Sequence, residues 1–308
     1  LERFSKSYRI INNEKFVEKL INFSVDQDYF ILLNSNNNSD KYDLLCGYGV
    51  KSFIKSSENS LTKLDNFFEL KKDWLFGYMT YDLRNEIEVL NDDNIDFINM
   101  PNLYFFQPEI VWFVKGKNVT GLSFDKDLID NDWKKFNEIS EKEKTENSNI
   151  VKLNLRNSKS EYINKVNKIK ERIFRGDCYE MNFCFDLFSE YDEINPYDTY
   201  VKLNNYTKSP MSSFLKANDL FLISSSPERF LSKNGEDIIS QPIKGTAKRG
   251  DNPEKDKKNI NELLSSPKEL SENHMIVDLV RNDLSRIAKK GSVKVKSCLL
   301  YTSPSPRD

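Results

Sequence analysis

A single lysine stands between an isoleucine and a glycine in the segment QPIKGTAKRG, residues 241–250. A lysine amine, with an ordinary pKa of about 10.4, is almost wholly protonated at neutral pH and is then a poor nucleophile. Desolvation, or a neighbouring cation such as Lys248 or Arg249, would favour the neutral amine of Lys244 and allow it to attack an electrophilic carbon. The alternative is an ordinary solvated lysine at the end of a strand.

Two carboxylates could accompany this amine. Glu228, in the segment SSSPERF, could serve as a general acid if burial keeps it protonated; the alternative is an ion pair with Arg229 or Lys244. Glu272 falls, at helical spacing, in the middle of an apolar stripe formed by the residues that follow it. A carboxylate buried there needs a cation, a metal or a proton, which leaves a buried salt bridge, for example to Arg281, or ligation of Mg²⁺.

The histidine count narrows the possible chemistry. His274 is the one histidine of the sequence, so a site with several histidine ligands is excluded, and a Ser-His-Asp or Cys-His site would have to use it. On a helix it lies on the face opposite Glu272. Any bound metal must be held by carboxylates, which indicates a hard ion such as Mg²⁺.

The elements that would position these residues can be read from hydrophobic patterns. Aromatic and branched runs at 28–36, 74–83 and 109–116 predict strands. A capping box at Ser158 and Glu161 and a stop at Gly176 predict a helix, and residues 177–188 then read as a buried strand. Because the strands come first and helices are interspersed later, the fold class is predicted to be α+β.

A hairpin and a helix are expected around the candidate chemistry. Asn234-Gly235 between two apolar runs predicts a two-residue turn, with Lys233 facing Glu236 and Glu228 facing Gln241. This register brings Glu228 and Lys244 to the same end of the hairpin, within about 10 Å. A further helix is predicted from Pro267, capped by Ser266, to Gly291.

Composition excludes some partners. A formal net charge of -2 gives no reason to expect nucleic acid or an anionic membrane, and no apolar run is long enough for a membrane span. The four cysteines show no CxxC pair, and no secretory signal precedes them, so we expect reduced thiols and a cytoplasmic protein.

In their order and spacing, five segments resemble the chorismate-utilising enzymes: GDCYEMNF, SSSPERFL, PIKGTAKRG, ENHMIVDLVRNDLSRIA and GSVKV. LFGYMTYDL and FFQPEIV resemble the amino-terminal domain of the same family, which includes anthranilate, aminodeoxychorismate, isochorismate and salicylate synthases. The resemblance implies the chorismate-binding fold, a sheet-rich two-layer sandwich with helices. It divides the chain into an amino-terminal region (1–125), a polar linker (126–150), the first part of a catalytic domain (151–296) and a non-native tail (297–308).

Within this family, the lysine of PIKGT resembles the aminodeoxychorismate synthases, whereas anthranilate synthases typically have alanine there. The resemblance implies that Lys244 adds covalently to chorismate, that Glu228 protonates the departing hydroxyl and that Glu272 holds Mg²⁺. It also implies that Gly245 and Thr246 contact the substrate and that a glutamine amidotransferase subunit supplies ammonia. Water-adding members usually have a lysine at the position of Glu180, so this residue argues against them.

The sequence departs from the family after GSVKV. The family continues with a catalytic histidine, a second metal-binding glutamate and the arginine and tyrosine that bind chorismate, and these motifs are not found here. We therefore expect a fold that is incomplete at its carboxyl end and a chain without turnover. The alternatives are an anthranilate synthase-like enzyme and a catalytically inactive fragment that binds the amidotransferase.

Overall fold

The computed structural model describes residues 2–39, 41–88, 90, 95–139, 151–190 and 194–296. The chain forms two compact units, one from residues 1–141 and 200–308 and one from residues 142–199. The predicted tail, 297–308, lies outside the described residues. Strands and helices are mixed along the chain, so the α+β class is confirmed.

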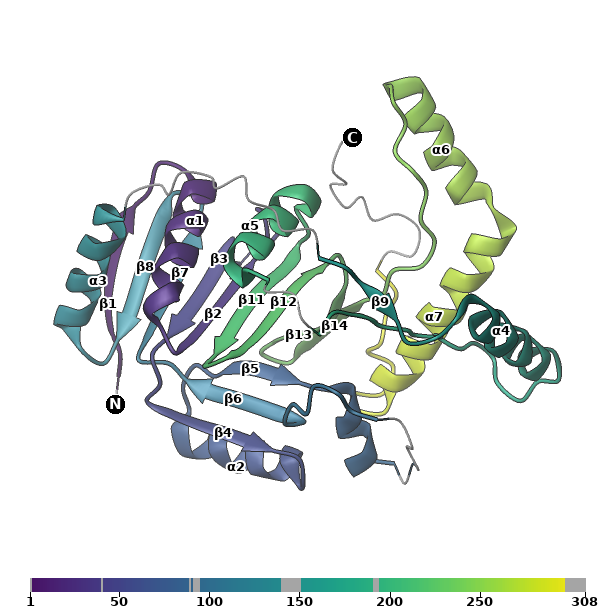
Figure 1. The fold of residues 1–308 in the computed structure, drawn as a ribbon, viewed down its shortest axis with the longest axis horizontal. Coiled ribbons are helices and arrows are strands. Elements are labelled where there is room, and N and C mark those ends of the chain that lie inside the picture. The colour runs from purple at the N-terminus through teal and green to yellow at the C-terminus, as the bar shows by residue number, and fades with distance from the viewer. Residues whose placement is uncertain are drawn as a thin grey trace. The chain divides into compact units, whose positions relative to one another are not determined.

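A seven-stranded sheet forms the centre of the first unit, with all neighbouring strands antiparallel (Figure 1). Its strand order is β1-β8-β7-β3-β2-β11-β12. Two of the predicted strands, within 28–36 and 109–116, are confirmed as β2 and β7. The bounds are Phe4–Arg9 for β1, Tyr29–Asn34 for β2, Leu44–Tyr48 for β3, Ile110–Lys115 for β7, Asn118–Ser123 for β8, Met211–Ala217 for β11 and Leu220–Ser226 for β12.

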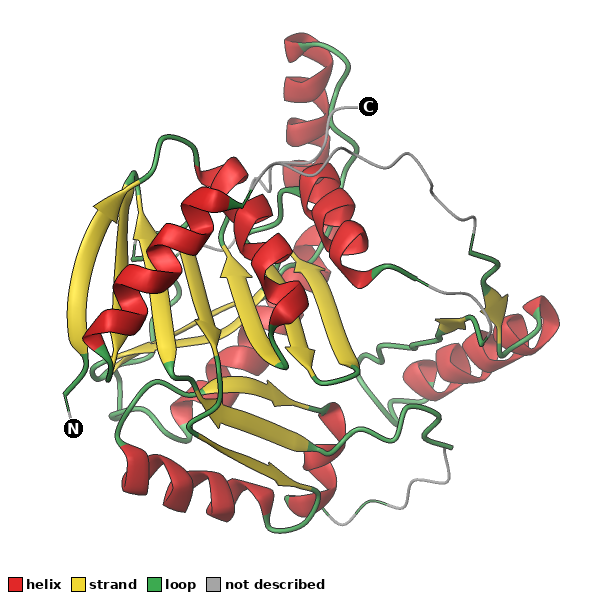
Figure 2. Cartoon of the chain, turned by 60° about the vertical axis from the view of Figure 1, so that its left-hand side comes forward, coloured by secondary structure: helices red, strands yellow, loops and turns green. Residues whose placement is uncertain are grey.

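Helices α1 (Asn13–Phe23), α3 (Lys126–Glu138) and the part of α5 (Pro196–Thr207) that belongs to this unit cover one face of the sheet (Figure 2). The Asn12 side chain caps α1 by accepting hydrogen bonds from two backbone N–H groups of its first turn. Phe16, Leu20 and Phe23 then recur at helical spacing and are buried. A short 3-10 helix, η1 (Ser24–Asp26), follows.

Helix α3 corrects part of the predicted linker. Residues 126–138 are helical, and Ile129, Asp132 and Phe136 are buried. The hydroxyl of Tyr48 donates to the Asp132 carboxylate (2.7 Å), which also pairs with Lys135 (3.0 Å). The segment is polar overall, but its few apolar residues fall on one helical face, and that face suffices for packing. The remainder, 140–150, lies outside the described residues.

A three-stranded sheet packs on the opposite face, in the order β4-β6-β5. The two sheets share an apolar cluster that contains Ile31, Val111 and Leu215 from the large sheet and Phe76, Tyr104 and Phe106 from the small one. This arrangement confirms the two-layer sandwich and the predicted strand within 74–83. The elements are β4 (Ser52–Ser56), α2 (Ser60–Lys71), β5 (Phe76–Met79), the 3-10 helix η2 (Tyr81–Glu86) and β6 (Leu103–Gln107).

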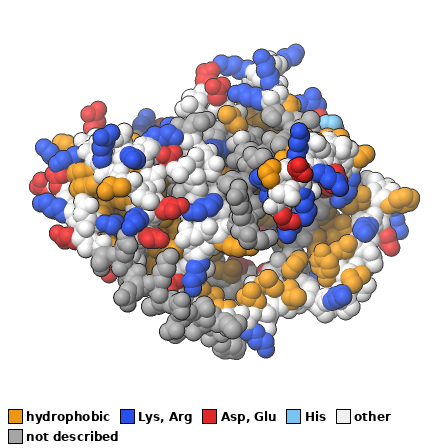
Figure 3. Space-filling model, turned by 90° about the horizontal axis from the view of Figure 1, so that it is seen from above, with side chains coloured by type: hydrophobic (Ala, Val, Ile, Leu, Met, Phe, Trp, Pro, Cys, Tyr) orange, Lys and Arg blue, Asp and Glu red, His pale blue; other side chains and the backbone are white. Residues whose placement is uncertain are grey.

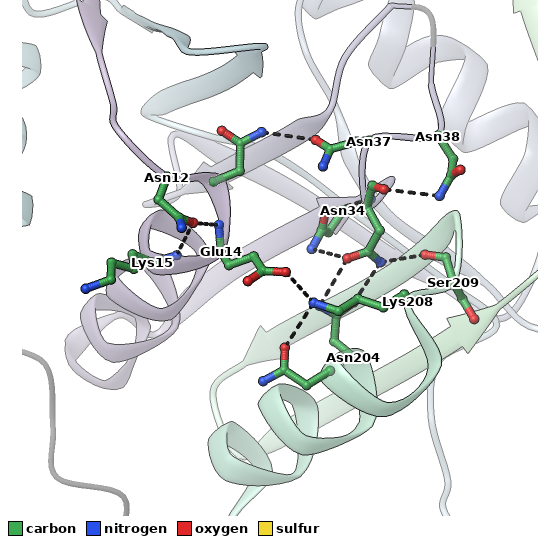
Figure 4. A network of polar contacts seen from close by, with 12 residues as sticks. Asn12, Glu14, Lys15, Asn34, Asn37, Asn38, Asn204, Lys208 and Ser209 are labelled. Carbon is green, nitrogen blue, oxygen red and sulfur yellow. Dashed lines mark hydrogen bonds and ion pairs between the residues drawn. The ribbon is translucent and has the colours of Figure 1, made fainter. Parts of the chain in front are cut away.

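A network of asparagines links α5 to the loop after β2 (Figure 4). The Asn36 amide donates to Asn204 (2.9 Å) and to the backbone carbonyl of Ser209 (2.7 Å). Lys208 forms an ion pair with Glu14 of α1 (2.6 Å). These contacts fix the start of β11, the strand that leads through β12 to the candidate site.

A hairpin of β13 (Arg229–Asn234) and β14 (Asp237–Gln241) follows β12. The predicted hairpin exists, but its register was wrong: Asn234 faces Asp237, and Arg229 rather than Glu228 faces Gln241. The two loop residues are Gly235 and Glu236, and within the loop Gly235 has a positive φ of 59°. A turn with glycine first therefore forms in place of the Asn-Gly turn, and an irregularity between Arg229 and Ser232 shifts the pairing.

Two helices end the described chain. Helix α6 (Pro253–Ser265), capped by Asn252, was not predicted. Helix α7 (Pro267–Ser285) begins as predicted at Pro267, where the Ser266 side chain accepts from the Glu269 N–H. It ends at Ser285 rather than near Gly291, although Gly291 does have the expected positive φ of 76°.

The second unit is built around α4 (Lys159–Phe174), where the predicted capping box of Ser158 and Glu161 is confirmed. The stop at Gly176 is confirmed by its φ of 81°. The predicted buried strand over 177–188 was wrong: only β10 (Leu187–Phe188) is a strand there, paired with β9 (Asn154–Leu155). Phe183 and Phe185 contact the ring of Tyr162 in α4, but Tyr179, Phe185 and Leu187 remain exposed, so the apolar run is only partly covered in the described part of this unit.

The distribution of surface charge and the state of the cysteines can be compared with the composition. Basic and acidic side chains are interspersed over the face seen from above (Figure 3). Cys46, Cys178 and Cys184 carry free thiols, and Cys298 lies outside the described residues. Within the described residues, no helix is both long enough and apolar enough to span a membrane.

Candidate active site

An open cleft of about 410 Å³ lies between the β13–β14 hairpin, the segment after it and helix α7. Apolar side chains of both elements form much of its lining, among them Ile238, Ile243, Val277 and Leu284. A cleft with an apolar lining and a few polar groups is the usual form of a small-molecule site. The sequence-predicted residues can therefore be placed relative to this cleft.

Lys244 and Gly245 line the cleft. Gly245 has a φ of 77°, a conformation that favours glycine and turns the chain directly after Lys244. Thr246 is exposed and is not part of the lining. Arg249, one of the cations proposed to act on the amine, binds Asp256 of α6 through two hydrogen bonds of 2.8 and 2.7 Å.

Glu228 lies close to Lys244 along the hairpin, but its side chain is exposed and outside the cleft lining. Its carboxylate accepts a hydrogen bond from the N–H of Ile243 (3.3 Å), the residue before Lys244. The prediction that Glu228 and Lys244 share one end of the hairpin is confirmed. Pro227 and Arg229, the neighbours of Glu228 in the connection from β12 to β13, line the cleft, whereas Glu228 does not.

Glu272 is not buried, so the predicted buried carboxylate was wrong. Its side chain is 41% exposed and pairs with Lys268 one turn earlier (3.6 Å). Arg281, the partner suggested by the sequence, pairs instead with Asp278. The helical spacing was read correctly, but no residue of α7 is buried among the described residues, so its apolar stripe creates no dry environment. His274 is exposed, as predicted.

Glu269 is a site residue that the sequence analysis missed. It lines the cleft from the first turn of α7, and a Cβ added to Gly245 would lie only 2.6 Å from its carboxylate oxygen. Glu269 and Glu272 both pair with Lys268, and the Coulomb attraction of Glu272, then that of Glu269, raises the pKa of Lys268. The sequence contains part of the information needed to find Glu269, because this residue lies three residues before Glu272 and so on the same side of the helix.

Positive charge dominates the cleft. The charged residues in its lining are five cations and one acid, Glu269; the cations are Arg229, Lys244, Arg281, Lys294 and Lys296. Cations that surround a low-dielectric cleft raise the local concentration of anions and favour their binding. The arrangement therefore suits a small anionic ligand with an apolar body.

The carboxylates fit a hard metal ion only in part. Glu269 and Glu272 supply the oxygen donors that Mg²⁺ prefers, and Mg²⁺ commonly uses one or two carboxylates together with waters and substrate oxygens. Among the described residues, no group of three or more His, Cys, Asp or Glu side chains is arranged to hold a metal. The first two turns of α7 thus offer part of a magnesium ligand set.

Comparison with known proteins identifies the family of the chain. Residues 25–300 match the family model for chorismate binding enzymes, and the chain belongs to this family. It is 36% identical over 149 residues to aminodeoxychorismate synthase component 1 of Escherichia coli K12, a match that covers 48% of this chain and 32% of that protein. It is 31% identical over 232 residues to anthranilate synthase component 1 of Lactococcus lactis, with coverage of 71% and 51%.

The fold is also that of a solved family member. Anthranilate synthase component I from Streptococcus pneumoniae superposes with a TM-score of 0.69 at 22% identity, covering 87% of this chain and 64% of that one. This likeness confirms the chorismate-binding fold. The matches span about a third of the Escherichia coli protein (32%) and about half of the Lactococcus lactis protein (51%).

Proposed function

We propose that this chain carries the first part of the catalytic site of an aminodeoxychorismate synthase component 1. Such an enzyme converts chorismate and ammonia to 4-amino-4-deoxychorismate, a precursor of p-aminobenzoate and folate. The observation that carries the proposal is the lysine of PIKGT, because its amine lines the cationic cleft and is followed by the turn at Gly245. The names of relatives such as the Escherichia coli protein support the same reaction.

In the proposed reaction, the neutral amine of Lys244 adds to the chorismate ring. Its lone pair forms a new C–N bond, the ring double bonds shift, and the C4–O bond breaks. The departing hydroxyl takes a proton and leaves as water, while the amine nitrogen loses a proton. Ammonia then adds at C4 and loses a proton, the double bonds shift back, and the C–N bond to Lys244 breaks as its nitrogen takes up a proton, which restores Lys244 as a neutral amine. The net change is replacement of the hydroxyl by an amino group.

Other residues of this chain would assist these steps. Glu228 is proposed to donate the proton to the departing hydroxyl, for which its carboxyl group must turn from the Ile243 N–H toward the cleft. Gly245 and Thr246 are proposed to contact the substrate through their backbone and hydroxyl groups. A glutamine amidotransferase partner, expected for a protein of the component 1 type, would supply the ammonia.

Glu272 and Glu269, one turn apart on α7, would hold Mg²⁺. When bound, the ion would neutralise a carboxylate of the substrate. The two carboxylates would fix the position of the ion, because both pair with Lys268 and both lie near the capped amino-terminal end of α7.

Product analysis tests the proposal. An extended version of the chain that carries the family's remaining carboxyl-terminal motifs is incubated with chorismate, Mg²⁺ and ammonia, alongside its Lys244→Ala variant and the matched Lys257→Ala variant; Lys257 is exposed and outside the cleft lining. The proposal predicts 4-amino-4-deoxychorismate as the product, lost in Lys244→Ala and retained in Lys257→Ala. A Lys244→Ala variant that keeps the rate of the unaltered chain would remove the lysine from the mechanism.

An anthranilate synthase-like reaction is the second candidate, favoured by the similarity to the Lactococcus lactis protein over 71% of this chain. That reaction releases pyruvate and forms anthranilate, which is fluorescent and easily separated. Anthranilate and pyruvate without 4-amino-4-deoxychorismate would establish this candidate and overturn the first.

A further inference from the structure

Arg229 is an unusual cation in the cleft. It is the first residue of β13, lies opposite Gln241 of β14 and lines the cleft together with Lys244. Its side chain is half-buried, and its Nε atom is shielded from solvent with no hydrogen-bond partner among the described residues. The other arginine in the lining, Arg281, has a carboxylate partner in Asp278.

A shielded guanidinium N–H without an acceptor is unfavourable, because the group has lost water and gained nothing in exchange. Such groups in a folded protein call for an explanation, and an anion that binds there is one. The nearest acid in the sequence, Glu228, accepts a hydrogen bond from the Ile243 N–H and lies outside the cleft lining. The one acid in the lining, Glu269, pairs with Lys268.

We propose that Arg229 binds a carboxylate group of the small-molecule ligand of this cleft and so selects for dianionic ligands. The inference rests on the proposed function, because it takes chorismate, a dicarboxylate, as the ligand. A guanidinium offers two parallel N–H groups that match the two oxygens of a carboxylate. Lys244, three residues beyond the position opposite Arg229, would then face the ring to which that carboxylate is attached.

The affinity test uses the full chain with Lys244→Ala as a common background, so that no covalent bond forms, and isothermal titration with chorismate. Arg229→Gln is expected to weaken binding about tenfold or more, because it removes a charged hydrogen-bonding pair. Arg229→Lys should recover part of the loss. Arg286→Gln is the matched control: Arg286 is exposed and outside the cleft lining, so its loss should leave affinity unchanged.

The two monomethyl esters of chorismate identify the contact. If Arg229 binds one carboxylate, Arg229→Gln should lose its effect with the ester at that carboxylate and keep it with the other ester. Binding by Arg229→Gln within twofold of the background chain would overturn the inference, as would an equal loss for both esters and for chorismate.

A stability measurement keeps the test decisive if Arg229→Gln folds poorly. Arg229→Met removes the unsatisfied charge while keeping an apolar stem, so its Tm without ligand should equal or exceed that of the unaltered chain. A Tm several degrees lower would show that Arg229 stabilises the fold and would contradict the inference. If the background chain binds no chorismate, the proposed function fails, and this Tm comparison still decides the role of Arg229.

Discussion

Helices α1 and α7 are both amphipathic and both capped by a side chain, Asn12 in one and Ser266 in the other. They differ in what covers them. Five residues of α1 are buried against the seven-stranded sheet, whereas the described structure buries none of α7. The same contrast separates the sheet, with its dense core of aromatic residues, from the hairpin and helices that surround the cleft.

The difference shows how one chain combines a rigid support with an accessible site. In the sheet region, burial fixes the side chains, and the buried carboxylate of Asp132 accepts hydrogen bonds from Tyr48 and Lys135. Around the cleft, caps, turns and ion pairs set the backbone, while the apolar side chains stay half-exposed. Stability should therefore depend on the first region and ligand binding on the second.

The largest expected effect compares two leucines. Leu20 of α1 is 0% exposed, and Leu279 of α7 is 55% exposed. Leu20→Ala should lower the free energy of unfolding by about 2–5 kcal/mol, because it leaves a cavity in a packed core. Leu279→Ala should change it by less than about 0.5 kcal/mol. Urea unfolding followed by tryptophan fluorescence measures both, since Trp74, Trp112 and Trp133 all lie in the sheet region. Equal losses of unfolding free energy in the two variants would contradict the proposed difference between α1 and α7.

A second comparison uses two helical carboxylates, each with a lysine partner. The Asp132 side chain is 2% exposed and that of Glu272 is 41% exposed. Asp132→Ala should cost about 1–3 kcal/mol, because the buried hydroxyl of Tyr48 loses its acceptor. Glu272→Ala should leave the urea midpoint unchanged. A marked loss of stability in Glu272→Ala would show that α7 has a structural core after all.

A third, smaller effect is expected at two glycines with positive φ. Gly291→Ala meets no atom within 4 Å, so it should cost only the strained backbone, about 1 kcal/mol. Gly245→Ala has the same strain but also pushes against the Glu269 carboxylate. It should therefore weaken chorismate binding, whereas Gly291→Ala should not. Unaltered affinity in Gly245→Ala, measured by isothermal titration, would contradict the close packing of this turn against α7.

The smallest effect is one of pH. Burial opposes ionisation of Asp73, but hydrogen bonds from Arg3 and Gln107 outweigh it and lower its pKa below the ordinary value of 3.8. The stabilisation is thus present above pH 3.8 and is lost as the pH falls through the lower pKa of the folded state. The stability gap between the unaltered chain and Asp73→Asn should narrow below that pH. A gap that stays constant during acid titration would show that Asp73 does not stabilise the fold by its charge.

Local signals in the sequence were reliable where the chemistry is local. The capping residues Ser158 and Ser266 and the glycine stop at Gly176 need only neighbours along the chain, and all were confirmed. The hairpin was found but shifted, because the turn uses Gly235 first rather than Asn234 and Gly235 together.

Features that depend on distant packing were missed. The burial of Asp132 and the exposure of Glu272 follow from what lies against each helix, which periodicity cannot show. The approach of Glu269 to Gly245 and the unsatisfied Arg229 arise from the fold of the hairpin against α7. Lys244 could be proposed from the sequence because its flanking residues are distinctive. The cleft that surrounds it could not be predicted in this way.

The most direct test of the central claim is intact-mass spectrometry after incubation with chorismate and Mg²⁺ without ammonia, followed by peptide mapping. The account predicts a mass gain equal to chorismate minus water on the peptide that contains Lys244, present in the control variant Lys257→Ala and absent in Lys244→Ala. An adduct that persists in Lys244→Ala, or an unmodified chain under conditions where chorismate binds, would contradict it.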